Sequence, residues 1–261
     1  MKPLEDEFLR SLIARFDGRG IIGIAITGSY SRGAQDKYSD VDLDIFVNDL
    51  PGDDYTLHIF DGKLVSVKYI RLADELDSLS KPERAVWSVN GLRSMVILAD
   101  PNGDLASLKQ KAANFKWESL QPAADRYAIE QLAGCSEEAR KIMSGLLQEN
   151  ESKVLYAAWG MFKGLSFAVL VQTGLLIPTE NRAFSLLEDH FGASHPWTRA
   201  FRFSFGMNIE AGVPAYKTRG MASLDLYEET HHLFTGILRD GHREVIGNTL
   251  QLISDFKKTW N

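Results

Sequence analysis

Features that define several classes of protein are scarce in this sequence. The chain of 261 residues has a single cysteine, Cys135, which cannot form an intrachain disulfide and suits a reducing compartment. Lysine and arginine together number 29 against 35 acidic residues, and the formal net charge of −6 argues against a general nucleic-acid binder. The acidic first residues do not resemble a signal peptide. We therefore expect a cytoplasmic protein that binds no nucleic acid.

Long hydrophobic runs without charge are also absent. The most apolar stretch spans residues 154–171 and carries Lys163 at its centre, where a charge costs about 3 kcal/mol in a membrane-spanning helix. A helix buried in a bundle is the better interpretation, and we expect no membrane contact. The hydrophobic share of 44% and the charged share of 25% are typical of a soluble protein with substantial cores.

The pattern of the sequence changes near residue 117. Before that point strand and helix patterns alternate, and Asp61-Gly62 is a strong signal for a two-residue hairpin turn. After it, strand signals vanish and long helical patterns fill the chain. The patterns predict strands over 21–27, 40–47, 55–60, 63–70 and 94–99, and helices over 3–16, 31–35, 72–90 with an interruption near 80–82, 104–115, 122–149, 151–173, 179–190, 219–240 and 242–259. We predict an α+β protein, with a mixed β-sheet flanked by helices in residues 1–117 and an all-helical bundle in residues 118–261.

The most informative segment runs from Gly28 to Asp42. A strand of small and β-branched residues leads into Gly28-Ser29, a polar turn follows, and the next predicted strand opens with Asp40-Val41-Asp42. Side chains two apart on a strand point to the same face, so Asp40 and Asp42 should present two carboxylates side by side. Carboxylate oxygens are the ligands that Mg²⁺ prefers. The segment therefore predicts a site that holds Mg²⁺ against the phosphates of a nucleotide.

The turn itself has residues suited to phosphate binding. Gly28 has no Cβ, so the backbone can approach a phosphate closely, and Gly33 keeps the backbone slim in the same way. Ser29 could cap the short helix predicted near 31–35 and donate its hydroxyl. Arg32 could reach a phosphate as a forked donor, although a surface ion pair is an equal alternative.

These residues resemble the nucleotide-binding motif of the DNA polymerase β-like nucleotidyltransferase superfamily. Its small bacterial members read Gly-Ser-x-x-x-Gly and then Ser-Asp-(Val/Ile)-Asp. The matching positions here are Gly28, Ser29, Gly33, Ser39, Asp40, Val41 and Asp42. The resemblance extends more loosely to about residue 115. A helical domain also follows in the antibiotic nucleotidyltransferases of this superfamily.

The resemblance implies an enzyme that depends on Mg²⁺ and transfers an NMP from an NTP, with ATP as the expected co-substrate. The acceptor would be a hydroxyl of a small, aminoglycoside-like molecule bound between the two domains, and a homodimer is possible. Asp40 and Asp42 would be the catalytic, metal-binding residues. The nucleotide would be bound by Gly28, Ser29, Arg32, Gly33 and Ser39.

One position departs from the family pattern. Family members place a third acidic residue on the next long strand, and the corresponding position here is Ser66. Asp44 could partly compensate, or a base could come from the helical part, where Glu149 and Glu151 precede an apolar helix. Two alternatives stay open. One is an enzyme that AMPylates a protein partner, which the long helical domain argues against, and the other is a degenerate nucleotide-binding homologue without activity, which Ser66 favours.

Overall fold

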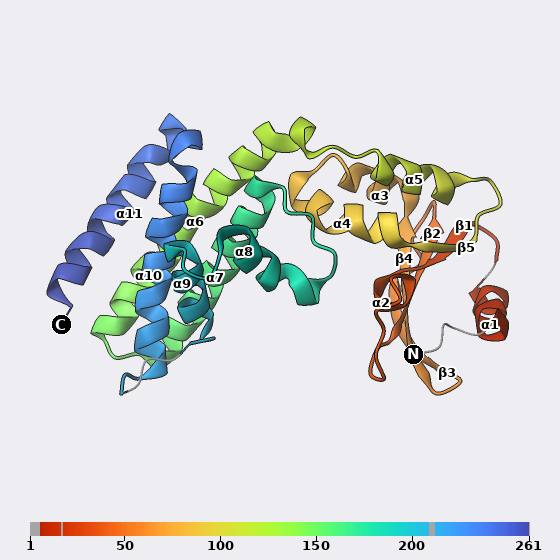
Figure 1. Ribbon diagram of the computed structural model, residues 1–261, viewed down its shortest axis with the longest axis horizontal. Helices are drawn as coiled ribbons and strands as arrows, with labels where there is room; N and C mark the ends of the chain where they lie inside the picture. The colour runs from red at the N-terminus through yellow and green to blue at the C-terminus, as the bar shows by residue number, and fades with distance from the viewer. Residues whose placement is uncertain (1–5, 17, 209–211, 261) are drawn as a thin grey trace. The chain divides into compact units, whose positions relative to one another are not determined.

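The chain folds into two compact units. A computed structural model describes residues 6–16, 18–208 and 212–260 (Figure 1). The first unit comprises Met1–Ser119 and Leu176–Glu180, and the second comprises Leu120–Leu175 and Asn181–Asn261. The sequence patterns assign every residue after 117 to the helical part, and they give no sign that Leu176–Glu180 folds with the first unit.

The first unit is built on a mixed sheet of five strands in the order β3-β4-β2-β1-β5. The strands are β1 Ile21–Ile26, β2 Val41–Val47, β3 Tyr55–Phe60, β4 Lys63–Arg71 and β5 Val96–Ala99. Only the β2–β4 pair is parallel among the pairs that the described residues form. Asp61 and Gly62 have positive φ angles of 47° and 73°, as a type I′ turn requires, and they join β3 to β4. The predicted two-residue hairpin is therefore confirmed, as is the α+β class.

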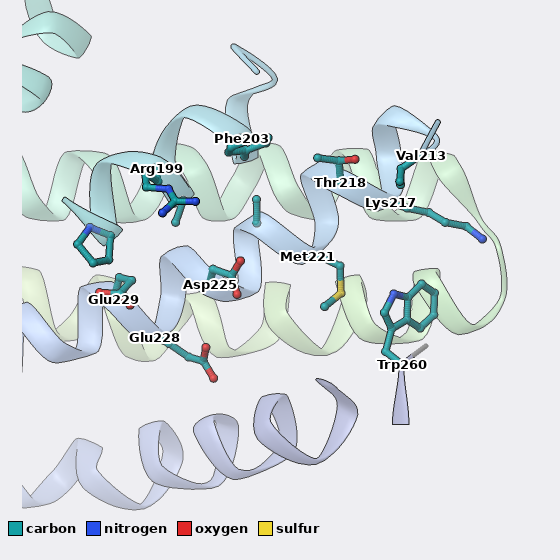
Figure 2. A pocket seen from close by; sticks show the side chains of 13 residues that line it. Arg199, Phe203, Val213, Lys217, Thr218, Met221, Asp225, Glu228, Glu229 and Trp260 are labelled. Atoms are coloured by element: carbon teal, nitrogen blue, oxygen red, sulfur yellow. The ribbon is translucent and has the colours of Figure 1, made fainter. Parts of the chain in front are cut away.

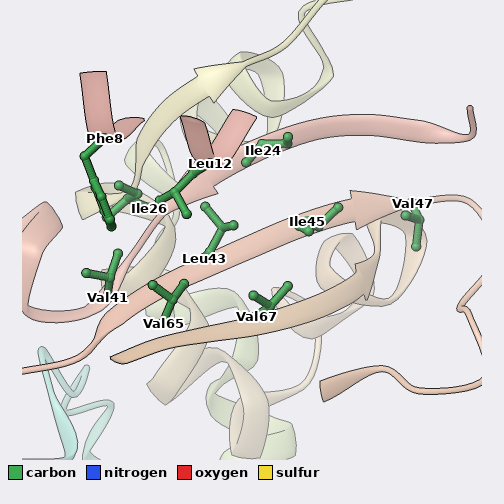
Figure 3. Close-up of a cluster of buried hydrophobic side chains, with 10 residues drawn as sticks. All are labelled: Phe8, Leu12, Ile24, Ile26, Val41, Leu43, Ile45, Val47, Val65 and Val67. Carbon is green, nitrogen blue, oxygen red and sulfur yellow. The ribbon is translucent and has the colours of Figure 1, made fainter. Parts of the chain in front are cut away.

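Hydrophobic clusters cover both faces of this sheet. The helices of the unit are α1 Asp6–Phe16, α2 Gly28–Ser31, α3 Leu72–Ser78, α4 Pro82–Ser94 and α5 Asp104–Ala113, with a 3-10 turn η1 at Trp117–Leu120. On one face, Phe8 and Leu12 of α1 pack against apolar residues of β1, β2 and β4 (Figure 3). On the other face, residues of α3, α4 and α5 pack around Phe46 and Ile70. The start of the helix predicted over 3–16 lies outside the described residues.

Apolar and acidic residues alternate along β2, and this alternation determines which side chains are available for a functional site. Val41, Leu43 and Ile45 enter the α1 cluster, so the residues between them must point to the other face. Those residues are Asp42 and Asp44. The next residue of β2 on that face, Phe46, belongs to the second hydrophobic cluster. The sheet thus buries one row of β2 and leaves a row of carboxylates on the opposite side.

The second unit consists of helices. They are α6 Gln121–Leu147, α7 Glu151–Thr173, α8 Ala183–Phe191, α9 Pro196–Phe205, α10 Ala215–Phe234 and α11 Asp240–Thr259, with a 3-10 turn at Thr235–Ile237. A further 3-10 turn, Glu180–Arg182, starts with the last residue of the first unit. Helix α7 is long and apolar enough to cross a membrane by length and composition alone, yet 61% of its most apolar window is buried in the protein. It therefore has the burial expected of a core helix. The sequence patterns missed α9, whose Trp197 and Phe201 stack in the core of this unit.

Candidate functional site

The turn after β1 is tighter than predicted. The short helix expected near 31–35 is wrong, because α2 occupies Gly28–Ser31 and starts at the glycine itself. The φ angle of Gly28 is +63°, a left-handed value that lets the chain turn as soon as β1 ends. Ser29 consequently lies inside the helix and does not cap it. The N-cap position belongs to Thr27, which makes no side-chain capping bond.

The carboxylate of Asp42 occupies the space where a side chain at Gly28 would stand. A Cβ atom added to Gly28 would lie 1.7 Å from Oδ2 of Asp42 and 2.6 Å from its Cγ. The backbone N–H of Thr27 also donates to the carbonyl oxygen of Asp42 over 3.0 Å. Only glycine at position 28 leaves room for this carboxylate, so the glycine turn and the aspartate form one structural feature.

Asp40 and Asp42 influence each other electrostatically. Strand β2 begins at Val41, so Asp40 lies immediately before the strand and not on it as predicted. Burial raises the pKa of Asp42, the charge of Asp40 raises it further, and a hydrogen bond from Ser66 and the charge of Arg32 lower it. In the described part of the chain, neither aspartate forms an ion pair with a lysine, arginine or histidine. The two carboxylates therefore repel each other, and no cation among the described residues is paired with either of them.

A divalent cation fits this arrangement. No three His, Cys, Asp or Glu side chains come together as a metal cluster among the residues that the structure describes. Mg²⁺ does not require such a cluster, because proteins commonly hold it with one or two carboxylates while phosphates and water complete its coordination. Asp40 and Asp42 supply that number of hard oxygen ligands.

The other predicted nucleotide-binding residues lie on the loop between α2 and β2. Gly33 has a φ angle of +65° and open space where a Cβ would stand. Arg32 is partly buried, and its charge acts on Asp42. Ser39 serves the loop, because its Oγ accepts from the N–H of Asp36 over 2.9 Å. The charge of Arg32 therefore acts on Asp42, whereas the hydroxyl of Ser39 is engaged in the turn.

Ser66 occupies the place beside Asp42. In the parallel register of β2 and β4, Asp42 lies opposite Ser66 and Asp44 opposite Lys68. Ser66 is only 7% exposed, and its Oγ donates to Oδ1 of Asp42 over 3.1 Å. A serine at this position orients the aspartate but adds no third negative charge.

A third carboxylate acts electrostatically on Asp42 from a segment that no sequence motif marks. The charge of Glu180 contributes to the raised pKa of Asp42, although it is the smallest of the causes. Glu180 ends the segment Leu176–Glu180, which folds with the first unit. Asn90 Nδ2 donates to the carbonyl of Leu176 over 2.9 Å, and the N–H of Ile177 donates to the carbonyl of Val86 over 2.7 Å. These bonds attach the segment to α4.

The bases suggested by the sequence are placed differently. Glu149 and Glu151 belong to the helical unit, and Glu149 forms an ion pair with Lys217 over 3.1 Å. No motif marks Glu180, which lies at the start of the helix predicted over 179–190 and more than 130 positions after Asp42 in the chain. Only the tertiary fold reveals its proximity to the carboxylates.

The comparisons with known proteins agree with this geometry. Residues 6–105 match the family model of the nucleotidyltransferase domain. This part of the chain is a nucleotidyltransferase domain of the DNA polymerase β-like superfamily. Among solved structures, the chain is similar to a nucleotidyltransferase-like protein from Exiguobacterium sibiricum 255-15, with a TM-score of 0.50 and 16% identity over 96% of this chain and 89% of that chain. At that identity the similarity shows the fold alone. No curated protein sequence matches the chain.

The helical unit that follows the nucleotidyltransferase domain contains a cavity of about 700 Å³ (Figure 2). That volume is within the range of small-molecule sites, which is roughly 300–1,000 Å³. Its lining combines apolar residues such as Phe203, Met221 and Trp260 with the carboxylates of Asp225, Glu228 and Glu229. Lys257 contacts the first two of these carboxylates and neutralises part of their charge. The lining is therefore mixed in character and only mildly acidic.

Asp44 should make the stability of the nucleotidyltransferase domain depend on pH. Burial raises its pKa from 3.8 to about 7, with Lys68 and a hydrogen bond from Thr27 opposing the shift. Between these values the folded protein holds a proton that the unfolded chain has released, so the free energy of unfolding should fall as the pH rises through this window. At about 1.4 kcal/mol per pKa unit, the loss is at most about 4 kcal/mol.

The variant Asp44→Asn should lose this part of the pH dependence and have a larger free energy of unfolding than the unmodified protein at pH 8. Chemical denaturation of both proteins at pH 5 and pH 8, in the presence of EDTA, measures the difference. Equal changes in the free energy of unfolding between the two pH values would contradict the assignment to Asp44.

Proposed function

We propose that the protein moves an NMP, in the first instance AMP, from an NTP bound with Mg²⁺ to a hydroxyl of a small molecule. One observation carries the proposal. Asp42 has its carboxylate against the Gly28 turn, a pKa raised by burial and by Asp40, and no ion pair among the described residues. A divalent cation would relieve this repulsion, and nucleotidyl transfer needs such a cation at the phosphates.

The residues divide the work of substrate binding. Asp40 and Asp42 would hold Mg²⁺, which neutralises charge on the phosphates when bound. Ser66 keeps Asp42 in place through its hydrogen bond of 3.1 Å. Gly28 leaves room for the carboxylate of Asp42, and Arg32, whose charge acts on Asp42, would donate to the phosphates.

The transfer step also needs a proton acceptor. The acceptor oxygen attacks the α-phosphorus, the bond from that phosphorus to the bridging oxygen breaks, and pyrophosphate leaves. We propose that Glu180 is the general base that accepts the proton of the attacking hydroxyl. Its charge acts on Asp42, and its segment is attached to α4.

Purified protein with α-labelled ATP, Mg²⁺ and a panel of hydroxyl-bearing small molecules tests the proposal. The panel should include aminoglycosides and uncharged polyols, because the mixed lining of the helical cavity is compatible with either an amine-bearing or a neutral acceptor. We expect labelled product and stoichiometric pyrophosphate, both abolished by EDTA. Binding of ATP without pyrophosphate release on every acceptor would instead favour a non-catalytic nucleotide-binding protein, as Ser66 suggests.

Glu180→Gln should lower kcat by about a hundredfold or more while changing the KM for ATP little, because a general base acts in the transition state and contributes about 10²–10⁴-fold. Glu149→Gln and Glu151→Gln are the matched controls, since the sequence suggested these residues as bases. Steady-state measurement of pyrophosphate release compares the three variants. Unchanged kcat in Glu180→Gln, or a comparable loss in either control, would remove Glu180 from the mechanism.

A further inference from the structure

The edge strand β3 exposes an apolar strip. Tyr55, Leu57 and Ile59 alternate along β3 on one face, and Leu64 of β4 pairs with Ile59 on that same face. The exposed fractions are 56% for Tyr55, 55% for Leu57, 68% for Ile59 and 41% for Leu64. We refer to these four residues as the β3 strip. Single exposed apolar residues are ordinary, but four adjacent ones on an edge strand indicate an interaction surface.

The other face of β3 is fixed by α1. Phe16 lies 5.9 Å from the ring of His58 and 6.0 Å from the ring of Phe60, and Arg15 lies over Phe60 at 5.0 Å. His58 and Phe60 alternate with the residues of the β3 strip, so these contacts with α1 lie on the face opposite the strip. The β3 strip is therefore presented by an ordered strand.

The outer edge of β3 lacks the features that usually prevent strand pairing. The strand reads Tyr-Thr-Leu-His-Ile-Phe and contains no proline, lysine or carboxylate. Its register with β4 is continuous from Tyr55 to Phe60, so no bulge twists the edge away. Among the strands that the described residues form, β3 is the last on its side of the sheet, so the backbone groups on its outer edge have no partner in any of those strands. Such an edge is a template for an added strand.

The β3 strip lies on the same face of the sheet as the candidate site. The register places Asp42 beside Ser66 and Ser66 beside Leu57, and Lys68 lies beside Tyr55. With about 5 Å between neighbouring strands, Leu57 is about 10 Å from the strand that carries Asp42. A ligand on the β3 strip would thus be bound close to the carboxylates without covering them.

A second copy of this chain fits the strip poorly. Antiparallel pairing of two β3 strands matches all the apolar residues only when Leu57 lies opposite Leu57 and Tyr55 opposite Ile59. The same register would place Asp53 opposite Asp61 at each end. Like charges directly opposite each other destabilise a sheet.

The charges around β3 define a different partner. Asp53 and Asp54 precede the strand and Asp61 follows it, and all three are exposed. Lys68, the cation beside Tyr55, lies opposite Asp44 of β2, and three carboxylates around β3 outnumber this one lysine. A complementary segment would be apolar at alternate positions and basic at both ends.

We propose that β3 binds an extended segment of a protein partner as a sixth strand of the sheet, with apolar side chains on the β3 strip and basic residues near Asp53, Asp54 and Asp61. The proposal concerns binding, goes beyond the proposed transfer reaction and does not depend on it. Backbone hydrogen bonds supply much of the affinity in this mode of recognition, so a model peptide of the right pattern is a valid probe.

The probe is the synthetic peptide Lys-Arg-Val-Thr-Val-Thr-Val-Arg-Lys carrying a fluorescent label, and anisotropy measures its binding to the full chain. We expect saturable binding and slower hydrogen exchange of the β3 amides. Leu57→Lys should weaken binding about tenfold or more, since it removes an apolar contact and adds repulsion with the basic ends. Leu147→Lys, at an exposed leucine of the helical unit, is the matched control and should bind normally.

Two control peptides test whether binding depends on the basic ends and on the alternation of apolar residues, and light scattering and ATP binding test the other possible roles of the strip. A peptide with glutamates in place of the basic residues, and one with the apolar residues grouped together, should each bind about tenfold more weakly. Absence of binding, equal binding of all three peptides, or equal binding by Leu57→Lys would overturn it. So would a dimer in light scattering that Leu57→Lys dissociates, or loss of ATP affinity in Leu57→Lys, because the strip would then serve self-association or the nucleotide.

Discussion

Replacing Asp42 by asparagine should lower the rate of nucleotidyl transfer by about three orders of magnitude and leave the fold intact. The amide keeps the shape of the side chain next to Gly28 but removes a charge that the bound cation needs, and losses of one electrostatic contact in an active site reach about 10²–10³-fold or more. Stability should not suffer. Burial and Asp40 raise the pKa of Asp42, so the ionised carboxylate is disfavoured in the folded protein and its removal relieves that cost.

Pyrophosphate release measures the rate, and calorimetry of ATP binding with and without Mg²⁺ measures the contribution of the cation. The matched control is Asp49→Asn, because Asp49 is an exposed aspartate just after β2 and contacts neither Gly28 nor Ser66. A rate within a few-fold of the unmodified protein in Asp42→Asn would show that Asp42 does not hold the metal. Thermal unfolding of each variant shows that the comparison is made between folded proteins.

The elements of the nucleotidyltransferase domain were predictable because local chemistry decides them. Positive φ angles at Asp61 and Gly62 are those that the dipeptide favours, so the β3–β4 hairpin followed from two residues. Alternation of apolar and polar residues fixed which face of β2 carries Asp42. The contact of Ser66 with Asp42 agrees with the expectation that the third acidic position is a serine here.

Features that depend on distant parts of the chain were not predictable in this way. The short helix was expected after Ser29, but the chain turns at Gly28 in a left-handed conformation and the helix starts there. The carboxylate of Asp42, 14 positions later in the chain, fills the space where a side chain at position 28 would stand. Glu180 reaches the neighbourhood of Asp42 only because backbone and side-chain hydrogen bonds hold its segment on α4. Neither effect leaves a periodic or compositional signal in the sequence.

Gly28→Ala should destabilise the domain and nearly abolish transfer. The left-handed φ of +63° costs an alanine about 1–2 kcal/mol, and the new Cβ would lie 1.7 Å from Oδ2 of Asp42, which adds about 1–3 kcal/mol of strain. The most flexible response is rotation of the Asp42 side chain away from the turn. That rotation would also break the hydrogen bond from Ser66 and displace the carboxylate that we assign to the metal.

Gly20→Ala separates the two contributions. Gly20 precedes β1, has a φ of +90° and has open space where a Cβ would stand, so its alanine variant carries the backbone strain without the collision. Chemical denaturation should show a loss of about 1–2 kcal/mol for Gly20→Ala and a larger loss for Gly28→Ala. Transfer should persist in the first variant and fail in the second, even at temperatures where both are folded. If Gly28→Ala lost no more stability than Gly20→Ala and kept its activity, the close contact with Asp42 could not be the reason for glycine at this position, and the metal-binding role of that carboxylate would lose its main geometric support.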